Sequence, residues 1–309
     1  MKVCRLHPNW EQRFTSRRAL IGCIGLMPTV EGGFKLTNER SAGPPQASTA
    51  PSGGSALHEV KSAGALVSWP YPRWIAHRGA GKLAPENTLA AFKLGASHGY
   101  RMFECDVKLS ADNALFLLHD TTLDRTSNGR GDARAMRWES LSKLDAGSWH
   151  SSSYAGEPLP SLEVIARYCL DNHFFLNIEI KPTPGLESRT GSVVANEAAR
   201  LWQGVATPPL LSSFLPACLA AALDAQPQLP RGLLLGELQD GWLDLAAQLQ
   251  CVAIVCNYKL WNLDTVRQAQ QAGFKTLCYT ANDEVVTQRL IALGVDGIIT
   301  DSVDRLKPD

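Results

Sequence analysis

The sequence predicts a (β/α)8 barrel, a ring of eight parallel strands surrounded by helices. Three observations lead to this fold class. From about residue 74 onward, short apolar runs alternate with helical periodicity, as in successive βα units. Nine strand candidates occur, and one of the links between them is short enough to force an antiparallel hairpin, which leaves eight. Charged or titratable residues stand at the ends of several strands, where barrel enzymes carry their sites.

Nine segments are predicted as strands from their apolar runs. They are residues 74–79, 101–107, 115–120, 175–181, 210–214, 231–236, 252–258, 276–280 and 297–300. The periodicity between them predicts helices, several of which end at Gly. These are residues 87–99, 161–171, 192–202, 241–249, 263–273 and 283–294.

One connection cannot be a βα crossover. Only residues 111–114 separate the run VKLS from LFLL, whereas parallel neighbours need a dozen or more residues between them. The two runs are therefore predicted to form a hairpin above the barrel rim, which returns His119 toward Glu104 and Asp106. Residues 121–160 contain no clear strand and many Gly, Ser and Arg, so they are predicted as an insertion before the next helix.

The bulk composition excludes several classes of protein. The chain has 309 residues and a formal net charge of zero, without a block of Lys and Arg, so nucleic acid is not an expected partner. No run approaches the roughly 20 apolar residues of a membrane span. The eight cysteines form no CxxC pair, and most lie within apolar runs, which predicts small buried residues in a reducing compartment. Nothing in the sequence specifies an oligomeric state.

The N-terminal part differs from the rest. Residues 28–64 are rich in Gly, Pro, Ser, Thr and Ala, so residues 1–68 are predicted to be a disordered extension preceding a folded domain over 69–309. Residues 16–27 combine a twin arginine with a short apolar run and the lipobox-like LIGC. Charged residues precede this run, and it is short for a signal peptide. We therefore expect a cytoplasmic protein, with export through residues 16–27 as the alternative.

Acidic residues on two strands raise the question of what balances their charge. In MFECDV, Phe103 and Cys105 share one strand face, while Glu104 and Asp106 share the other. Two carboxylates ~5 Å apart repel by about 3 kcal/mol at an effective dielectric constant of 20, and Glu179 of NIEIK adds to this. Protonation, an ion-pair network with cationic side chains, or a bound divalent metal would relieve the repulsion. The metal is favoured, and hard oxygen ligands suit Ca²⁺ or Mg²⁺ rather than zinc.

Two histidines and two basic side chains accompany these acidic residues. His77 and His119 each end an apolar strand, whereas the other five histidines lack such a setting. An imidazole titrates near pH 6.5, so one can start neutral as a base and another protonated as an acid. Arg78 and Lys181 can hold anionic oxygens, and together these groups suit a phosphodiester substrate.

With these residues identified, the chain resembles the glycerophosphodiester phosphodiesterase family, in its bacterial cytosolic-type branch. The matching strings are AHRGAGKLAPENTLAAF, ECDVKLSADNALFLLHDTTLDRTSNGRG, LNIEIKP, LLSSF and GVDGIITD. They extend from about Trp74 to Asp301. The resemblance implies a barrel of the phosphatidylinositol-phospholipase-C-like kind, which agrees with the strand count.

Roles for individual residues follow from the resemblance. It implies that His77 and His119 are the acid–base pair and that Glu104, Asp106 and Glu179 bind one divalent cation. The other expected contacts are with substrate, from Arg78, Lys181, Glu86, Asn87, Phe214 and Tyr279. Three of these keep an alternative: Asn87 as a helix N-cap, Glu86 as a helix-dipole charge, and Phe214 as a core residue. The family usually has Trp-Thr-x-Asn where this chain has Tyr279-Thr280-Ala281-Asn282, which leaves leaving-group preference open.

The expected activity is therefore metal-dependent hydrolysis of glycerophosphodiesters, such as glycerophosphocholine and glycerophosphoethanolamine, to sn-glycerol 3-phosphate and an alcohol. Two alternatives remain at this point. A phospholipase acting on intact lipid would need an exposed apolar rim, which residues 121–160 do not indicate. A protein that only captures phosphodiesters would tend to lack a histidine or a metal carboxylate, and this chain has all five.

Overall fold

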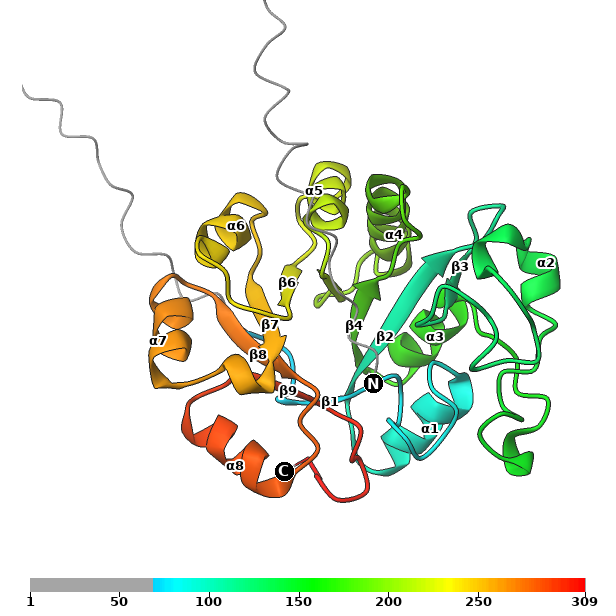
Figure 1. The fold of residues 1–309 in the computed structure, drawn as a ribbon, viewed down its shortest axis with the longest axis horizontal. Helices are drawn as coiled ribbons and strands as arrows, with labels where there is room; N and C mark the ends of the chain where they lie inside the picture. Colours follow the sequence, from blue (N-terminus) through cyan, green and yellow to red (C-terminus); the bar gives the residue numbers. More distant parts are fainter. Residues whose placement is uncertain (1–68, 309) are drawn as a thin grey trace, which may run out of the picture. The chain divides into compact units, whose positions relative to one another are not determined.

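A computed structural model of the chain describes residues 69–308, in which a ring of strands is surrounded by helices (Figure 1). The strands are β1 (Trp74–Ala76), β2 (Met102–Leu109), β3 (Leu115–Leu117), β4 (Phe175–Ile180), β5 (Leu210–Ser213), β6 (Arg231–Leu235), β7 (Ala253–Asn257), β8 (Lys275–Tyr279) and β9 (Gly297–Thr300). The helices are α1 (Leu89–Ser97), α2 (Trp138–Leu141), α3 (Leu162–Asp171), α4 (Glu187–Leu201), α5 (Pro216–Ala225), α6 (Trp242–Gln248), α7 (Leu263–Gln271) and α8 (Glu284–Ala292).

The strand pairings confirm the predicted (β/α)8 barrel. Eight strands pair in parallel in the order β1, β9, β8, β7, β6, β5, β4, β2, and β2 pairs back with β1 to close the ring. The ninth strand, β3, pairs only with β2 and runs antiparallel to it, so the predicted hairpin is also confirmed. The hairpin follows from link length, because the five residues between β2 and β3 are too few for the crossover that parallel neighbours need.

Three strand boundaries differ from the prediction by two residues or more, at the ends of β1, β2 and β3, the last of which ends at Leu117 instead of residue 120. Strand β1 ends at Ala76 instead of residue 79, because Arg78 and Gly79 have φ angles of +51° and +98°, which no strand accommodates. Strand β2 continues to Leu109 instead of residue 107, because its last residues pair with β3. The first difference matters for the site, since it places His77 and Arg78 in a turn at the barrel mouth.

Three helices were less well predicted, one of them the short α2, which lies within residues 121–160. Helix α4 begins at Glu187 rather than residue 192, and its Gly191 packs so closely that an added Cβ would lie 2.2 Å from the carbonyl oxygen of Cys218. Helix α5 has no counterpart among the predicted helices. Its sequence, PACLAAALDA, is apolar on most sides and therefore gives little amphipathic periodicity.

Strand alternation separates two apolar cores. The interior of the barrel holds a cluster that includes Ile75, Met102 and Leu277. The larger core, between strands and helices, includes Phe103, Cys105 and Ile178. Glu104 and Asp106 share the β2 face of Met102 and therefore point inward, as predicted. All cysteines of the described residues are buried and unpaired, as expected.

A small separate apolar core lies between the hairpin and residues 121–160, the segment predicted as an insertion. Phe116 and Leu118 of the hairpin pack there against Leu123, Leu141 and Leu159. Within residues 69–308, no helix has both the length and the apolar character that a membrane crossing requires. The predicted extension, residues 1–68, and the export-like stretch at 16–27 lie outside the described residues.

Candidate active site

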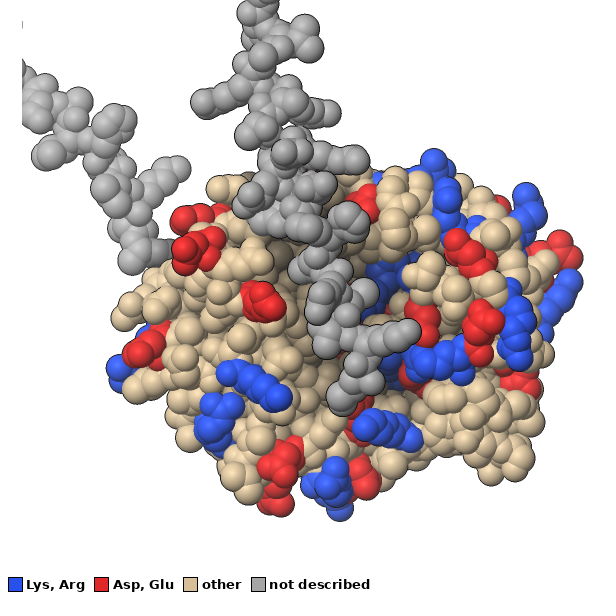
Figure 2. All heavy atoms as spheres, in the orientation of Figure 1, with Lys and Arg blue, Asp and Glu red and all other residues tan. Residues whose placement is uncertain are grey.

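A cleft opens where the strands of the barrel end, with a volume of roughly 500 Å³ that includes space open to solvent. Its lining combines charged and apolar side chains from both halves of the barrel: His77, Arg78, Glu104, His119, Asn177, Glu179, Lys181, Phe214, Leu234, Tyr279, Thr280 and Ile299. Figure 2 shows acidic and basic side chains gathered on the side of β2, β3 and α2. The opposite wall of the cleft is uncharged and is formed by Phe214, Leu234, Tyr279 and Ile299, which come from β5, β6, β8 and β9 or directly follow them. The cleft therefore suits a ligand with one anionic end and one less polar end.

Three carboxylates converge in this cleft. Glu104, Asp106 and Glu179 each offer an oxygen atom, and these atoms lie within 4.8 Å of one another. They come from adjacent parallel strands, with Asp106 paired directly with Glu179 between β2 and β4. All three are buried, with exposed fractions of 2%, 0% and 9%. The structure thus brings together the three residues that the sequence predicted as metal ligands.

Cationic partners satisfy this cluster only in part. Asp106 lies 3.0 Å from Arg78 Nε and 3.6 Å from Lys181 Nζ, and Lys181 also lies 2.8 Å from Glu179 Oε1. Glu104 receives one hydrogen bond, from the backbone N–H of Arg78 at 3.1 Å. Glu104 Oε1 and Asp106 Oδ1 are buried without a hydrogen-bond donor. An inert ion-pair network leaves these anionic oxygens unsatisfied, whereas a hard divalent cation would use them.

The burial and crowding of these groups shift their pKa values in different directions. Burial, and then the charge of Asp106, raises the pKa of Glu104 to about 8. Burial also raises the pKa of Glu179, against the opposing effect of Lys181. Burial would raise that of Asp106 as well, but Arg78 and Lys181 together hold its pKa below the usual range. In the absence of a cation, one negative charge is therefore fixed at Asp106, and the other carboxylates resist ionisation.

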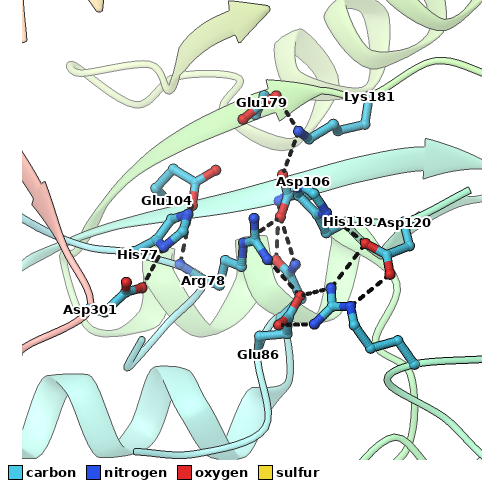
Figure 3. A network of polar contacts seen from close by, with 12 residues as sticks. His77, Arg78, Glu86, Glu104, Asp106, His119, Asp120, Glu179, Lys181 and Asp301 are labelled. Carbon is cyan, nitrogen blue, oxygen red and sulfur yellow. Dashed lines mark hydrogen bonds and ion pairs between the residues drawn. The ribbon is translucent and has the colours of Figure 1, made fainter. Parts of the chain in front are cut away.

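The two histidines are held in the same way by carboxylates. His77 Nδ1 lies 2.6 Å from Asp301 Oδ1, and His119 Nδ1 lies 2.7 Å from Asp120 Oδ1 (Figure 3). Both aspartates have lowered pKa values, so each is an ionised acceptor and Nδ1 carries the proton. The Nε2 atom of each ring is then left to accept or donate a proton in the cleft.

The two imidazoles differ in proton affinity. Burial lowers the pKa of His77, but the hydrogen bond to Asp301 and the charge of Glu104 outweigh it, so that the net pKa is raised. Burial lowers the pKa of His119, and Lys181 and Arg78 oppose the charge of Asp106, so that its net pKa is lowered. The site therefore contains one imidazole that favours the charged form and one that favours the neutral form.

The turn after β1 orders the remaining polar residues. Arg78 donates from Nη1 to Glu86 Oε1 at 2.7 Å, which excludes a purely helix-dipole role for Glu86. Asn87 donates to Asp106 Oδ2 at 2.9 Å and accepts from the Asp106 backbone N–H. The alternative assignment of Asn87 as an N-cap is wrong, because Thr88 caps α1 through Ala91 N–H. A helix N-cap has extended backbone, whereas the left-handed φ of +60° at Asn87 turns its side chain toward β2.

The uncharged wall contains both predicted aromatic residues. Phe214 and Tyr279 pack edge to face with ring centroids 5.5 Å apart, and Lys181 Nζ lies 5.6 Å from the Phe214 ring centroid. Phe214 remains 36% exposed and lines the cleft, so it is not a core residue. Tyr279 donates its hydroxyl to the Leu235 carbonyl oxygen at 3.0 Å, which fixes its ring against β6.

Four residues that order the site were not predicted from the sequence. Asp301 holds His77, and Asn282 donates to Asp301 Oδ2 at 2.9 Å. Asp120 holds His119, and Arg125 bonds to Asp120. A sequence signal existed for the aspartates, since Asp120 ends one predicted strand, LFLLHD, and Asp301 directly follows another, GIIT.

Comparison with known proteins agrees with this geometry. The model of the glycerophosphoryl diester phosphodiesterase family matches residues 77–305, which is most of the chain. The chain belongs to this family. It is therefore a phosphoric diester hydrolase, as the sequence predicted. The region that matches the family model begins at His77, the first residue of the site.

Relatives of this phosphodiesterase include enzymes and solved structures. A glycerophosphodiester phosphodiesterase of Caldanaerobacter subterraneus subsp. tengcongensis is 34% identical over 237 residues, which cover 75% of this chain and 95% of that protein. An Oleispira antarctica phosphodiesterase, solved with the product sn-glycerol-3-phosphate, is 31% identical with a TM-score of 0.72, over 76% of this chain and 95% of that one. A glycerophosphodiester phosphodiesterase of Agrobacterium tumefaciens is 27% identical with a TM-score of 0.66, over 75% and 97%.

Proposed function

We propose that the protein hydrolyses glycerophosphodiesters, such as glycerophosphocholine and glycerophosphoethanolamine, to sn-glycerol 3-phosphate and an alcohol, with one divalent cation and the pair His77 and His119. The observation that carries the proposal is one cleft in which both imidazoles have Nδ1 held by a carboxylate, beside a cluster of three carboxylates. The product found with the Oleispira antarctica relative supports sn-glycerol 3-phosphate as the product here.

Glu104, Asp106 and Glu179 would hold the cation, either Ca²⁺ or Mg²⁺. Their unsatisfied buried oxygens and the lack of Cys or His among the three fit a hard ion. When bound, such an ion supplies positive charge that stabilises the phosphate oxygens during the displacement. Arg78 and Lys181, which line the same cleft, would contact the phosphate and add to this stabilisation.

His77 would act as the base and His119 as the acid. His77 Nε2 accepts the proton of the glycerol 2-hydroxyl, whose oxygen attacks phosphorus and forms a cyclic phosphate. The bond from phosphorus to the leaving alkoxide breaks, and His119 Nε2 donates its proton to that oxygen. Water then opens the cyclic phosphate, with His119 taking the proton of water and His77 returning its proton to the 2-oxygen, which restores both imidazoles.

The pKa directions of the ligand-free protein oppose this order, because His77 holds its proton more tightly than His119. Bound substrate changes both environments. The phosphate anion beside His119 raises the pKa of that imidazole. Glu104 lies 3.8 Å from His77 Nε2, and once its charge is neutralised by the bound cation it would no longer raise the pKa of His77. Ligand binding therefore moves both groups toward the proposed assignment.

Chelation tests the proposal directly. We expect the purified protein to release sn-glycerol 3-phosphate from glycerophosphocholine, and a chelator of divalent ions to abolish that release, since the carboxylates alone repel a phosphate. The measurement is a coupled colorimetric assay of glycerol 3-phosphate, with Ca²⁺ or Mg²⁺ added back to the chelated protein. Intact phosphatidylcholine serves as the control and should not be cleaved. Full turnover in excess chelator, or cleavage of the intact lipid at a similar rate, would contradict the proposal.

A substrate lacking the 2-hydroxyl tests the internal attack. We expect the choline diester of 2-deoxyglycerol phosphate to bind but to turn over at least about a hundredfold more slowly, because it has no neighbouring nucleophile. Release of choline is measured for both diesters, together with inhibition of the normal reaction by the deoxy compound. Turnover at the normal rate would rule out the cyclic intermediate and would leave direct attack by water.

A further inference from the structure

Arg125 bridges two carboxylates at the edge of the cleft. Its Nε and Nη2 donate to Asp120 at 2.7 and 3.0 Å, and its Nη1 and Nη2 donate to Glu86 at 2.7 and 2.8 Å. One guanidinium therefore makes a paired contact with each carboxylate, a geometry that a lysine side chain lacks. Figure 3 shows Asp120 and Glu86, the two carboxylates that Arg125 bridges, among the site residues.

Each carboxylate that Arg125 holds also holds a residue of the proposed mechanism. Asp120 accepts from His119 Nδ1 at 2.7 Å. Glu86 accepts from Arg78 Nη1 at 2.7 Å, through the same Oε1 atom that Arg125 contacts. A continuous series of charged contacts thus runs from His119 through Arg125 to Arg78. The series ties together the loop after β1, the end of the β2–β3 hairpin and the insertion at residues 121–160.

We propose that Arg125 is a positioning residue for phosphodiester cleavage, which orients His119 through Asp120 and Arg78 through Glu86. This inference rests on the proposed roles of His119 and Arg78. Arg125 itself does not line the cleft. Arg125 fixes the imidazole of His119 and the guanidinium of Arg78 relative to each other, because neither Asp120 nor Glu86 can rotate without losing its paired contact with Arg125.

A purely structural role fits these contacts less well. The Arg125 side chain is 44% exposed, and exposed ion pairs contribute little to folding stability. Its paired contacts instead fix the rotamers of two partly buried carboxylates, Glu86 and Asp120, with exposed fractions of 13% and 29%. Loss of Arg125 should therefore change catalysis much more than the unfolding temperature.

The first test compares Arg125→Gln and Arg125→Lys with a matched control, Arg137→Gln, in the full-length protein. Arg137 lies in the same insertion, is 74% exposed and has one ion pair, to Asp112 at 3.5 Å. We expect the Gln variant to lose about 10- to 100-fold in kcat/KM for glycerophosphocholine, the usual cost of losing a partner that orients an active group. The Lys variant should recover part of this loss, and the control should change by less than about twofold.

The kinetic parameters and the unfolding temperature separate positioning from folding. The effect through His119 should lower kcat, and the effect through Arg78 should raise KM, with unfolding temperatures within a few degrees of the unaltered protein. If the Gln variant does not fold, the Lys variant carries the test. A change under about threefold in both Arg125 variants, or a loss matched by the Arg137 control, would overturn the inference.

The second test is a mutant cycle in the background Glu86→Gln with Asp120→Asn. If Arg125 acts only through these two carboxylates, adding Arg125→Gln there should cost less than about twofold. A full additional loss would overturn the inference. The His119→Ala variant separates the positioning role of Arg125 from the proposed role of His119 in catalysis. Loss of activity in His119→Ala with none in Arg125→Gln rejects the positioning role alone, whereas normal activity in His119→Ala rejects the proposed mechanism.

Discussion

Replacement of either His77 or His119 by Ala is expected to lower kcat for glycerophosphocholine by about 10² to 10⁴-fold. Each imidazole presents Nε2 to the cleft while Nδ1 is fixed by an ionised aspartate, so its replacement by Ala removes a positioned proton carrier. KM should change much less, because Arg78 and Lys181 remain to contact the phosphate. Steady-state release of glycerol 3-phosphate measures both parameters.

The two variants should differ when the leaving group changes. A diester whose leaving group is p-nitrophenol departs without a proton, so the His119→Ala variant should recover much of its rate on that substrate. The His77→Ala variant should remain slow on both substrates, because the attacking oxygen still needs a base. The reverse pattern would exchange the acid and base assignments. His98→Ala, at the C-terminal end of α1 and away from the cleft lining, is the control.

The parts of the fold that were predicted correctly depended on the length of the links between strands and on the alternation of side chains along each strand. The predicted four-residue link, residues 111–114, decided the hairpin, and leaving that strand out of the ring reduced nine strands to a closed ring of eight. Alternation along β2 placed Glu104 and Asp106 inside the barrel, opposite the core residue Phe103. Helix α5 was not predicted, because a helix that is apolar on most sides lacks the contrast between faces on which periodicity depends.

The supporting residues of the site could not be predicted with the same logic. Asp301 lies 224 positions from His77 in sequence, and only closure of β9 against β1 brings them together. Their approach also needs a glycine, since a Cβ at Gly81 would lie 2.2 Å from the backbone of Asp301. Arg125 likewise meets Glu86 through an irregular insertion, for which no periodicity exists. The strands that carry the site residues are predictable from sequence, whereas contacts between loops require the assembled barrel.

The Glu104→Gln variant is expected to separate stability from function. Glu104 has a pKa of about 8 in the folded protein, against 4.5 for an unperturbed group. Between these values the folded state binds more protons than the unfolded state, so the free energy of unfolding of the metal-free protein falls as pH rises, by at most about 1.4 kcal/mol per pH unit for one proton. Gln keeps the shape of Glu104 and cannot ionise, so it should remove this dependence.

In chelator at pH 8, Glu104→Gln should therefore be more stable than the unaltered protein by on the order of 1–3 kcal/mol. Its amide can also donate from the position of Oε1 toward the neighbouring carboxylates, which lie within 4.8 Å. The same change removes a proposed metal ligand, so activity should fall on the order of a thousandfold and Ca²⁺ should no longer raise Tm. Thermal unfolding from pH 5 to 9, with Ca²⁺ or with chelator, measures both effects.

The opposite signs of these two effects make the test specific. A carboxylate that serves only an ion-pair network stabilises the fold, and its replacement by Gln destabilises it. A carboxylate kept for a cation destabilises the metal-free fold, because its charge is buried beside Asp106 and its one ion-pair partner among the described residues is His77, 3.8 Å away. Glu139→Gln, whose side chain is 82% exposed and paired with Lys143, should change neither property. If Glu104→Gln proved less stable in chelator at pH 8, or still bound Ca²⁺ with unaltered affinity, the three-carboxylate cation site would be wrong.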